Sequence, residues 1–220
     1  VSTGTTIATA SAADPESQTI TYSLSGTGSG NFAIDSAGNI TLAAGLDYET
    51  ATSYSLTLSA SDGVNTTNNT LTITVDDVNE APSLSSSLAA SSFAENVSTG
   101  TTIATASASD PESQSITYSL SGTGSGNFAV DSSGNITLAA GLDYETATSY
   151  SLTLSASDGV NTTTNTLAIS ISDVNEAPSL TNSLAASSFA ENVSTGTTIA
   201  TASASDPEAQ TITYSLSGTG

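Results

Sequence analysis

The sequence predicts an all-β protein made of tandem β-sandwiches, and three observations carry this prediction. A segment of 96 residues is repeated along the chain. Within each repeat, apolar residues alternate with Ser and Thr in short runs, which is the period of a strand with one buried face. Turn segments rich in Gly, Asp and Asn separate these runs, and no longer segment follows the helical period.

The repeat is set by the segment beginning Val1-Ser2-Thr3-Gly4, which recurs at Val97 and at Val193. Only nine of 84 aligned positions differ between residues 1–84 and 97–180. A unit of 96 residues exceeds the about 20–45 residues of a solenoid repeat and matches the roughly 100 residues of a whole β-sandwich. We therefore expect three repeats, in residues 1–80, 81–176 and 177–220, with the first cut at its start and the last at its end.

Each complete repeat is expected to contain about seven strands, the number typical of such a sandwich. In the second repeat the alternating runs are 92–97, 101–107, 115–120, 127–130, 135–138, 150–156 and 165–172. Side chains two positions apart share a face of a strand, so Ile116, Tyr118 and Leu120 should all point into the core.

The charge of the chain excludes several classes of function. Lys, Arg, His and Cys are absent, while 21 Asp and Glu residues give a net charge of −21. Nucleic acids and anionic membranes would repel such a chain, and no apolar run is long enough to insert directly into a membrane. High net charge is also typical of disorder, but hydrophobic residues make up 36% of the chain and their regular spacing favours a folded core.

An enzyme is also disfavoured by this composition. Without His, Cys, Lys or Arg, only a pair of carboxylates is left for acid–base catalysis. The best pair, Asp143 and Glu145, is better explained as metal ligands. We therefore expect no enzymatic activity.

The acidic residues are concentrated in five short motifs per repeat, which contain 18 of the 21. In the second repeat the motifs are 94–96, 110–112, 142–145, 158–159 and 173–178. Each motif taken alone fits a plain structural role, such as a hairpin turn, a polar loop or a solvated strand edge. Their joint recurrence at one fixed spacing, in a chain without cationic side chains, favours a metal site instead.

The chemistry of these motifs selects a hard cation. Asp143 and Glu145 lie two positions apart, so an extended backbone places both carboxylates on one face, where they repel unless a cation joins them. Calcium takes six to eight oxygen ligands from carboxylates, amides and backbone carbonyls. A supply of Asp, Glu and Asn without His or Cys favours such an ion over zinc or copper.

The same residues resemble a known family, the cadherin repeat. The resemblance is carried by the runs 128–137, 142–145 and 150–159, by the linker Asp173-Val174-Asn175-Glu176-Ala177-Pro178, and by Ala94-Glu95-Asn96. It covers the whole chain and implies Greek-key, immunoglobulin-like sandwiches that bind Ca²⁺ at the junctions between consecutive repeats. The near-identical repeats, rich in Ser, Thr and Ala, further resemble a cadherin-like array of a large bacterial surface adhesin.

The resemblance also implies a set of ligands for each junction. For the first junction these are Asp47, Glu49, Asp77, Asn79, Glu80, Asp110, Glu112 and Asp158. For the second they are Glu95, Asp143, Glu145, Asp173, Asn175, Glu176, Asp206 and Glu208. The linkers carry Glu80 and Glu176 where the family usually has Asp, and Ala81 and Ala177 where it has Asn, so both two and three ions per junction stay open.

Two functions remain after these exclusions. The first is a calcium-stiffened extender of a large extracellular, cell-surface adhesin, in which the partners of the repeats are Ca²⁺ and the neighbouring repeats. The second is a module that itself binds a cell-surface ligand or a second copy of the chain. Near-identical copies favour the extender, and the aromatic content of 5%, with no Trp or Arg, leaves few anchors for a protein partner.

Overall fold

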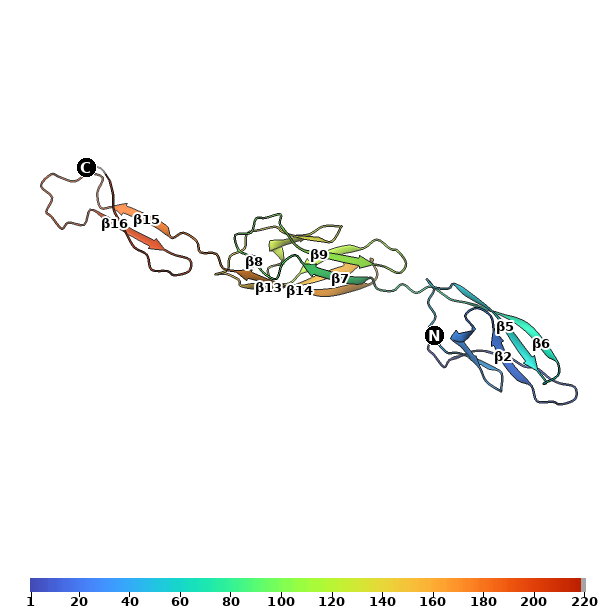
Figure 1. Ribbon diagram of the computed structural model, residues 1–220. Helices are drawn as coiled ribbons and strands as arrows, with labels where there is room; N and C mark the ends of the chain where they lie inside the picture. The colour runs from blue at the N-terminus through green and yellow to red at the C-terminus, as the bar shows by residue number, and fades with distance from the viewer. Residues whose placement is uncertain (219–220) are drawn as a thin grey trace. The chain divides into compact units, whose positions relative to one another are not determined.

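The structure, a computed structural model, describes residues 1–218 and divides into two compact units. The first unit comprises Val1–Glu80 together with the short loop Pro111–Ser113, and the second comprises Ala81–Asp110 together with the residues from Gln114 onward (Figure 1). Within the described residues, regular structure outside the strands is confined to two short 3-10 turns, η1 at Ser29–Asn31 and η2 at Ser125–Asn127. The protein is therefore all-β, as the sequence predicts.

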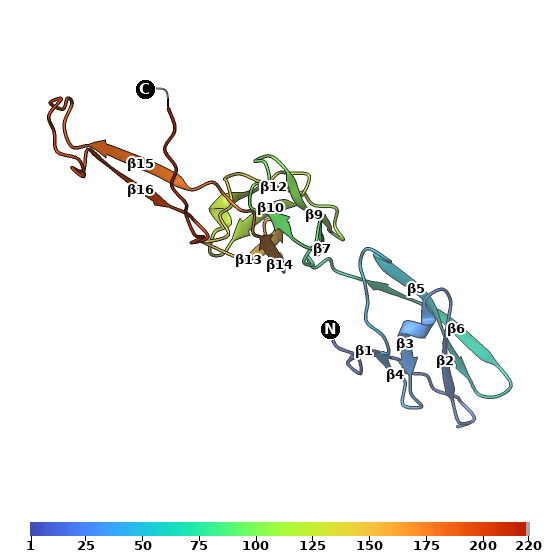
Figure 2. The same ribbon diagram turned by 60° about the vertical axis from the view of Figure 1, so that its left-hand side comes forward.

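The first unit contains two antiparallel sheets of three strands each, β1-β4-β3 and β2-β5-β6 (Figure 2). Its strands are β1 (Thr6–Thr9), β2 (Thr21–Ser25), β3 (Phe32–Ile34), β4 (Asn39–Leu42), β5 (Ser53–Ser61) and β6 (Thr66–Thr74). Their inward side chains form a core around Phe32, Ile40, Leu42, Tyr54 and Leu56. Alternation of apolar and hydroxyl side chains thus produces a half-buried sheet on each side of one core.

The second unit contains two four-stranded sheets, β10-β13-β14-β8 and β11-β12-β9-β7, followed by the hairpin β15-β16. Its strands are β7 (Ser83–Leu88), β8 (Phe93–Ala94), β9 (Thr102–Ser109), β10 (Thr117–Ser121), β11 (Phe128–Val130), β12 (Asn135–Leu138), β13 (Ser149–Ser157), β14 (Thr162–Ser172), β15 (Ser179–Leu184) and β16 (Ala200–Ser205). The two sheets enclose a core that is larger than that of the first unit and includes Ile103, Leu152, Leu154 and Ile169.

The second repeat has eight strands, one more than the sequence predicts. The additional strand is β7, whose sequence Ser-Leu-Ser-Ser-Ser-Leu contains only two apolar residues and so gives a weak periodic signal. It lies at the edge of its sheet and pairs with β9 from Ser83 opposite Ser109 to Leu88 opposite Ala104. The following strand β8 is short and pairs in parallel with the end of β14.

One aromatic contact in the core and one glycine in a turn are notable in the second unit. Phe128 and Tyr150 meet edge to face, with ring centroids 5.3 Å apart, which is a favourable arrangement for aromatic rings. Gly134 adopts a left-handed φ of +82°, and a Cβ atom at this position would lie 2.4 Å from the carbonyl oxygen of Ala106. Only glycine fits there, because this turn brings β12 back against β9.

No helix long and apolar enough to cross a membrane is found among residues 1–218.

Candidate metal centre

Two clusters of carboxylates are the candidate functional sites. In the first unit, Glu49, Asp77 and Glu112 each offer an oxygen within 4.8 Å of the others. In the second unit, Glu95, Asp143 and Glu145 form one such group, and Glu145, Glu176 and Glu208 form another. Glu145 belongs to both, so these five residues make up one continuous five-carboxylate cluster.

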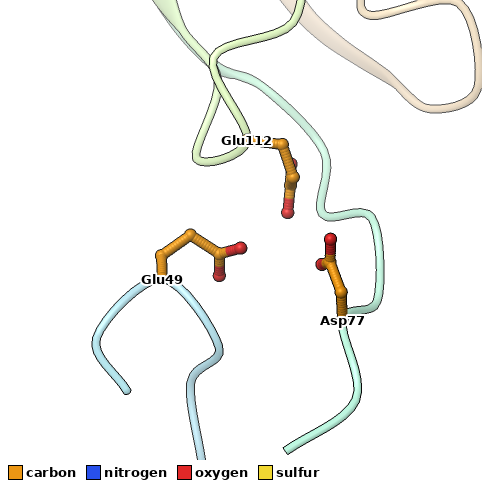
Figure 3. Close-up of side chains that lie close together, drawn as sticks. All are labelled: Glu49, Asp77 and Glu112. Atoms are coloured by element: carbon orange, nitrogen blue, oxygen red, sulfur yellow. The ribbon is translucent and has the colours of Figure 1, made fainter. Parts of the chain in front are cut away.

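The first-unit cluster is assembled from three loops that lie far apart in the sequence. Figure 3 shows the carboxylates of Glu49, Asp77 and Glu112 pointing toward one another from three separate segments. Glu49 follows β4, Asp77 follows β6, and Glu112 lies in the loop 111–113. A recess of about 310 Å³ beside them is lined by Leu46, Asp47, Glu49, Glu80 and Pro111.

The five-carboxylate cluster is organised around Glu95. This residue is 5% exposed, and it is the one buried charged residue found in the described part of the chain. Its Oε2 accepts a hydrogen bond from the backbone N–H of Tyr144 at 2.6 Å, and its Oε1 accepts one from the N–H of Val174 at 2.7 Å. Glu95 therefore ties the 142–145 segment to the linker after β14 and brings their acids together.

A second link holds the linker to the loop that contains Glu208. The backbone N–H of Glu176 donates to Oε1 of Glu208 at 2.8 Å. The side-chain amide of Gln210 donates to Oδ1 of Asn175, and Nδ2 of Asn175 in turn donates to the carbonyl oxygen of Glu176. The same linker bond recurs in the first unit, where the N–H of Glu80 donates to Oε1 of Glu112 at 3.3 Å.

The electrostatics of the five-carboxylate cluster are those of crowded acids. The pKa of Glu176 is raised from 4.5 to about 7 by a hydrogen bond with Glu208, by burial, and by the charges of Glu95, Glu208 and Glu145. The pKa of Glu208 is lowered in turn by the hydrogen bond that Glu176 donates. The two shifts are opposite in sign because these carboxylates face each other and no cationic side chain offsets their charges.

Glu145, which belongs to both groups of the cluster, shows the same crowding. A hydrogen bond from its own backbone N–H lowers the pKa of Glu145, but burial and the charges of Glu95, Asp173 and Glu208 outweigh it and the net shift is upward. Asp173 thus lies close enough to Glu145 to act on it electrostatically. In the first unit, a hydrogen bond with Glu112, burial and neighbouring charges likewise raise the pKa of Glu80 to about 7.

Several of the predicted ligands also have local structural roles. Asp143 accepts hydrogen bonds from the N–H and the hydroxyl of Thr146, both at 2.9 Å. Asp206 accepts one from the N–H of Gln210, and Asp158 caps its hairpin by accepting from the N–H of Val160. A carboxylate has about four acceptor positions, so these bonds leave room for a cation.

The arrangement fits a hard divalent cation. Oδ2 of Asp110 and the Oε2 atoms of Glu176 and Glu208 are buried without a hydrogen-bond partner among the described residues. A buried carboxylate oxygen without a partner is costly unless a cation balances it. Two oxygens on opposite sides of Ca²⁺ are about 4.8 Å apart, twice the usual distance of about 2.4 Å, which fits the spacing within these groups.

The structure brings together eight of the predicted ligands. These are Glu49, Asp77, Glu112, Glu95, Asp143, Glu145, Glu176 and Glu208. Asp47 and Glu80 line the recess beside Glu49, while Asp110, Asp158 and Asp206 lie outside the converging groups among residues 1–218.

Sequence reasoning missed one contributor, Gln210, which holds Asn175. Its signal was present in the sequence, because Gln18, Gln114 and Gln210 recur at the 96-residue spacing, four positions after the aspartate of each Asp-Pro-Glu segment.

Comparisons of the sequence and of the fold with known proteins point to the same family. The family model described as "Cadherin domain" matches residues 1–76 and 90–172. The Drosophila melanogaster "Protocadherin-like wing polarity protein stan" is 35% identical over 226 residues, covering 93% of this chain and 6% of that protein. The human "Protocadherin Fat 4" is 34% identical over 192 residues, covering 81% of this chain and 4% of that protein.

A solved structure shows the same fold. The structure titled "Protocadherin Gamma B2 extracellular cadherin domains 3-6" matches with a TM-score of 0.61 and 27% identity, covering 94% of this chain and 52% of that one. The chain thus spans a small part of the two curated relatives and about half of this structural neighbour.

Proposed function

Because the chain belongs to the cadherin domain family, we propose that its repeats bind Ca²⁺ at their linkers and that the bound ions stiffen the array into an extender of a larger extracellular adhesin. The observation that carries the proposal is the five-carboxylate cluster, in which buried oxygens of Glu176 and Glu208 lack a partner among the described residues. A chain without cationic side chains must balance these charges from solution.

The family itself fixes the general class of activity. Cadherin domains are extracellular modules of calcium-dependent adhesion, and the homologues are adhesion proteins rather than enzymes. We further propose the role of an extender and a division of the chain into repeats at 1–80, 81–176 and 177–220.

The ligands proposed for each linker follow the repeat. At the first linker they are Asp47, Glu49, Asp77, Asn79, Glu80, Asp110, Glu112 and Asp158. At the second they are Glu95, Asp143, Glu145, Asp173, Asn175, Glu176, Asp206 and Glu208. Carboxylate and amide oxygens dominate both sets, which is the donor chemistry that Ca²⁺ prefers.

Stiffening follows from what these side chains do with and without a cation. Bound Ca²⁺ supplies the positive charge that removes the repulsion among the carboxylates. Glu95 holds the linker at Val174 in either case, whereas Glu176 and Glu208 come from the linker and from the following loop. When their charges are balanced, both segments are held in one arrangement, and when they are not, mutual repulsion drives them apart.

Calorimetric titration of the 220-residue chain with Ca²⁺ tests the binding step. We expect Asp77→Asn to weaken binding at the first linker at least tenfold, while Asp76→Asn, which removes the same charge from the adjacent position, leaves it within twofold. Asp76 lies outside the converging groups of the described residues. Equal losses from the two variants would mean that the chain attracts calcium only through its net charge.

Small-angle scattering with Ca²⁺ and with EDTA tests the stiffening step. We expect the maximum dimension of the chain to shrink, and the distribution of its interatomic distances to broaden, when calcium is removed. At low calcium, the Glu145→Gln variant should resemble the EDTA state. The Asp131→Asn variant, in which the lost charge belongs to a turn, serves as the matched control. An unchanged maximum dimension in EDTA would refute the extender role even if calcium binds.

We also propose that the parent adhesin is a bacterial surface protein. Near-identical repeats rich in Ser, Thr and Ala support a bacterial surface array, although the relatives reported above are animal proteins. A chain in which every repeat presents nearly the same surface is suited to spacing, because each copy would otherwise bind the same target.

A further inference from the structure

Gln210 joins two residues that the proposed function makes calcium ligands. Its side-chain amide donates a hydrogen bond to Oδ1 of Asn175, in the linker after β14. Its backbone N–H donates to Oδ1 of Asp206 at 2.9 Å, in the loop after β16. All three residues lie in the second unit. Gln210 therefore holds the linker to the following loop through one oxygen of each proposed ligand.

Asn175 and Asp206 define a position beside the five-carboxylate cluster. Asp206 lies outside the converging groups among residues 1–218, but it is two positions before Glu208, which belongs to the cluster. A cation held by Asn175 and Asp206 would therefore be additional to those that the two groups could hold. In the calcium-free chain, Gln210 bonds the oxygens of this position instead.

A side-chain amide is suited to stand in for a cation at this position. Its N–H groups carry partial positive charge and donate to oxygen atoms, but it has no net charge that would repel Ca²⁺ from a distance. The orientation of Asn175 is fixed as well, because its Nδ2 donates to the carbonyl oxygen of Glu176 at 2.9 Å and leaves Oδ1 to accept. The chain has no Lys or Arg that could take this role.

We propose that Gln210 is a place-holder for calcium. It closes the linker through Oδ1 of Asn175 while calcium is scarce, and it must leave this oxygen before Asn175 can serve as a ligand. The two bonds exclude each other, because a cation on Oδ1 would lie against the partly positive hydrogens of the Gln210 amide. This role, which rests on the proposed calcium sites, makes Gln210 a residue that sets their affinity: binding at Asn175 is weakened by the fraction of time that Gln210 occupies it.

The release of Gln210 requires no change in the core. Asn175 and Gln210 are both exposed, so the amide moves into water, where it regains hydrogen bonds. Glu95 continues to hold the linker at Val174, at 2.7 Å. Only the outer contact between the linker and the loop is exchanged, and the exchange is therefore reversible.

The backbone of the loop orients this glutamine in the same way in every repeat. Its N–H donates to Oδ1 of the aspartate four positions earlier, at 2.9 or 3.0 Å, in the pairs Gln18–Asp14, Gln114–Asp110 and Gln210–Asp206. The residue before the glutamine has a left-handed φ of 61° at Ser17 and Ser113 and of 58° at Ala209. Residues other than glycine rarely adopt this φ, and a strained position points to a role for the side chain that it orients.

Hydrogen exchange of the 220-residue chain in EDTA tests the closed state. The reporter is the backbone amide of Glu176, which bonds Glu208 and so joins the linker to the loop. Gln210→Met keeps the length of the side chain but removes its amide. We expect it to accelerate this exchange by about two- to tenfold, the range that one neutral hydrogen bond supplies. Gln18→Met makes the same change in the first repeat and should leave the rate unaltered.

A calcium titration followed by nuclear magnetic resonance at the side-chain amide of Asn175 tests the release. We expect Gln210→Met to tighten calcium binding there by about two- to tenfold, because the occupancy of the place-holder sets both this factor and the exchange rate. Gln210→Glu should tighten binding further, since it puts a carboxylate in place of the amide. Loss of a residue that merely supported the loop would weaken binding, so a looser linker in EDTA together with tighter calcium binding is specific to a place-holder.

A double-mutant cycle assigns the effect to the bond between the two amides. Once Asn175 is replaced by alanine, Gln210→Met should no longer change the exchange rate of Glu176. A rate that still changes in that background, or that is unaltered by Gln210→Met alone, would overturn the place-holder. Calcium binding at Asn175 that is weaker or unchanged in Gln210→Met would do the same, while leaving the proposed calcium sites intact. If calcium shifts no resonance at the second linker of the unchanged chain, the calcium sites and the place-holder fail together.

Discussion

Glu95 should be a large contributor to the stability of the second unit, even without calcium. It is 5% exposed and accepts two backbone N–H bonds, at 2.6 and 2.7 Å. A hydrogen bond to a charged group contributes about 1.5–3 kcal/mol. Replacing Glu95 by alanine removes two such bonds and leaves the N–H groups of Tyr144 and Val174 without their acceptor, so we expect a loss of about 3–5 kcal/mol.

The assay is urea unfolding in EDTA, followed by the near-ultraviolet circular dichroism of tyrosine, since the chain has seven Tyr and no Trp. The two units are expected to unfold in separate transitions, and only that of the second unit should shift. Hydrogen exchange at the amides of Tyr144 and Val174 should accelerate in the variant, which locates the effect.

The chain provides a matched control in Glu191. This residue occupies the same Ala-Glu-Asn motif one period on, but it is exposed in the third repeat. Glu191→Ala should therefore change stability by less than about 0.5 kcal/mol. A loss for Glu95→Ala as small as that for Glu191→Ala would refute the argument that the two N–H bonds, rather than the motif, give Glu95 its importance.

Three other predictions concern pH, a turn and the core. The pKa of Glu176 is raised from 4.5 to about 7, so the stability that Glu176 contributes without calcium is complete below about pH 4.5 and is lost as the pH rises through about 7. Melting curves recorded in EDTA should show this loss of stability. The Glu176→Gln variant should show a smaller dependence on pH. An equally steep fall in the variant would assign the effect to other acids. Gly134→Ala should destabilise the second unit by about 3 kcal/mol, because the new side chain combines a left-handed φ with a clash. At Gly141 a Cβ atom would meet no atom within 4 Å, so Gly141→Ala should change the stability little. Similar urea midpoints for the two variants would contradict the clash. Phe93 is 7% exposed and the equivalent Phe189 is 40% exposed. In the same unfolding assay, Phe93→Ala should lower the free energy of unfolding by about 3–5 kcal/mol. Phe189→Ala should lower it by well under half as much.

Residue spacing was sufficient to predict most of the secondary structure. The strands predicted at 135–138 and 150–156 correspond to β12 and β13 within one residue at each end. These segments alternate strongly between apolar and hydroxyl side chains, and the alternation reflects burial on one face. Strand β7 was missed because its pairing with β9, rather than its own composition, makes it a strand.

The candidate site, too, could be predicted from the sequence only in part. The absence of cationic side chains and the recurrence of the acidic motifs predicted a calcium site and its residue types from the sequence alone. Which carboxylates converge is decided by tertiary structure, because Glu95 and Glu145 are 50 positions apart and meet only when Glu95 bonds the N–H groups of Tyr144 and Val174.

By itself, the sequence determined the repeat, the all-β class and the acidic chemistry, since each depends on the identity and spacing of neighbouring residues. Only the tertiary structure decided that Glu95 is buried between the 142–145 segment and the linker after β14, and that it brings the acids of both segments together. The physical reason is that burial and pairing depend on which distant strands are present to cover a side chain, and identical local sequences carry no information about that.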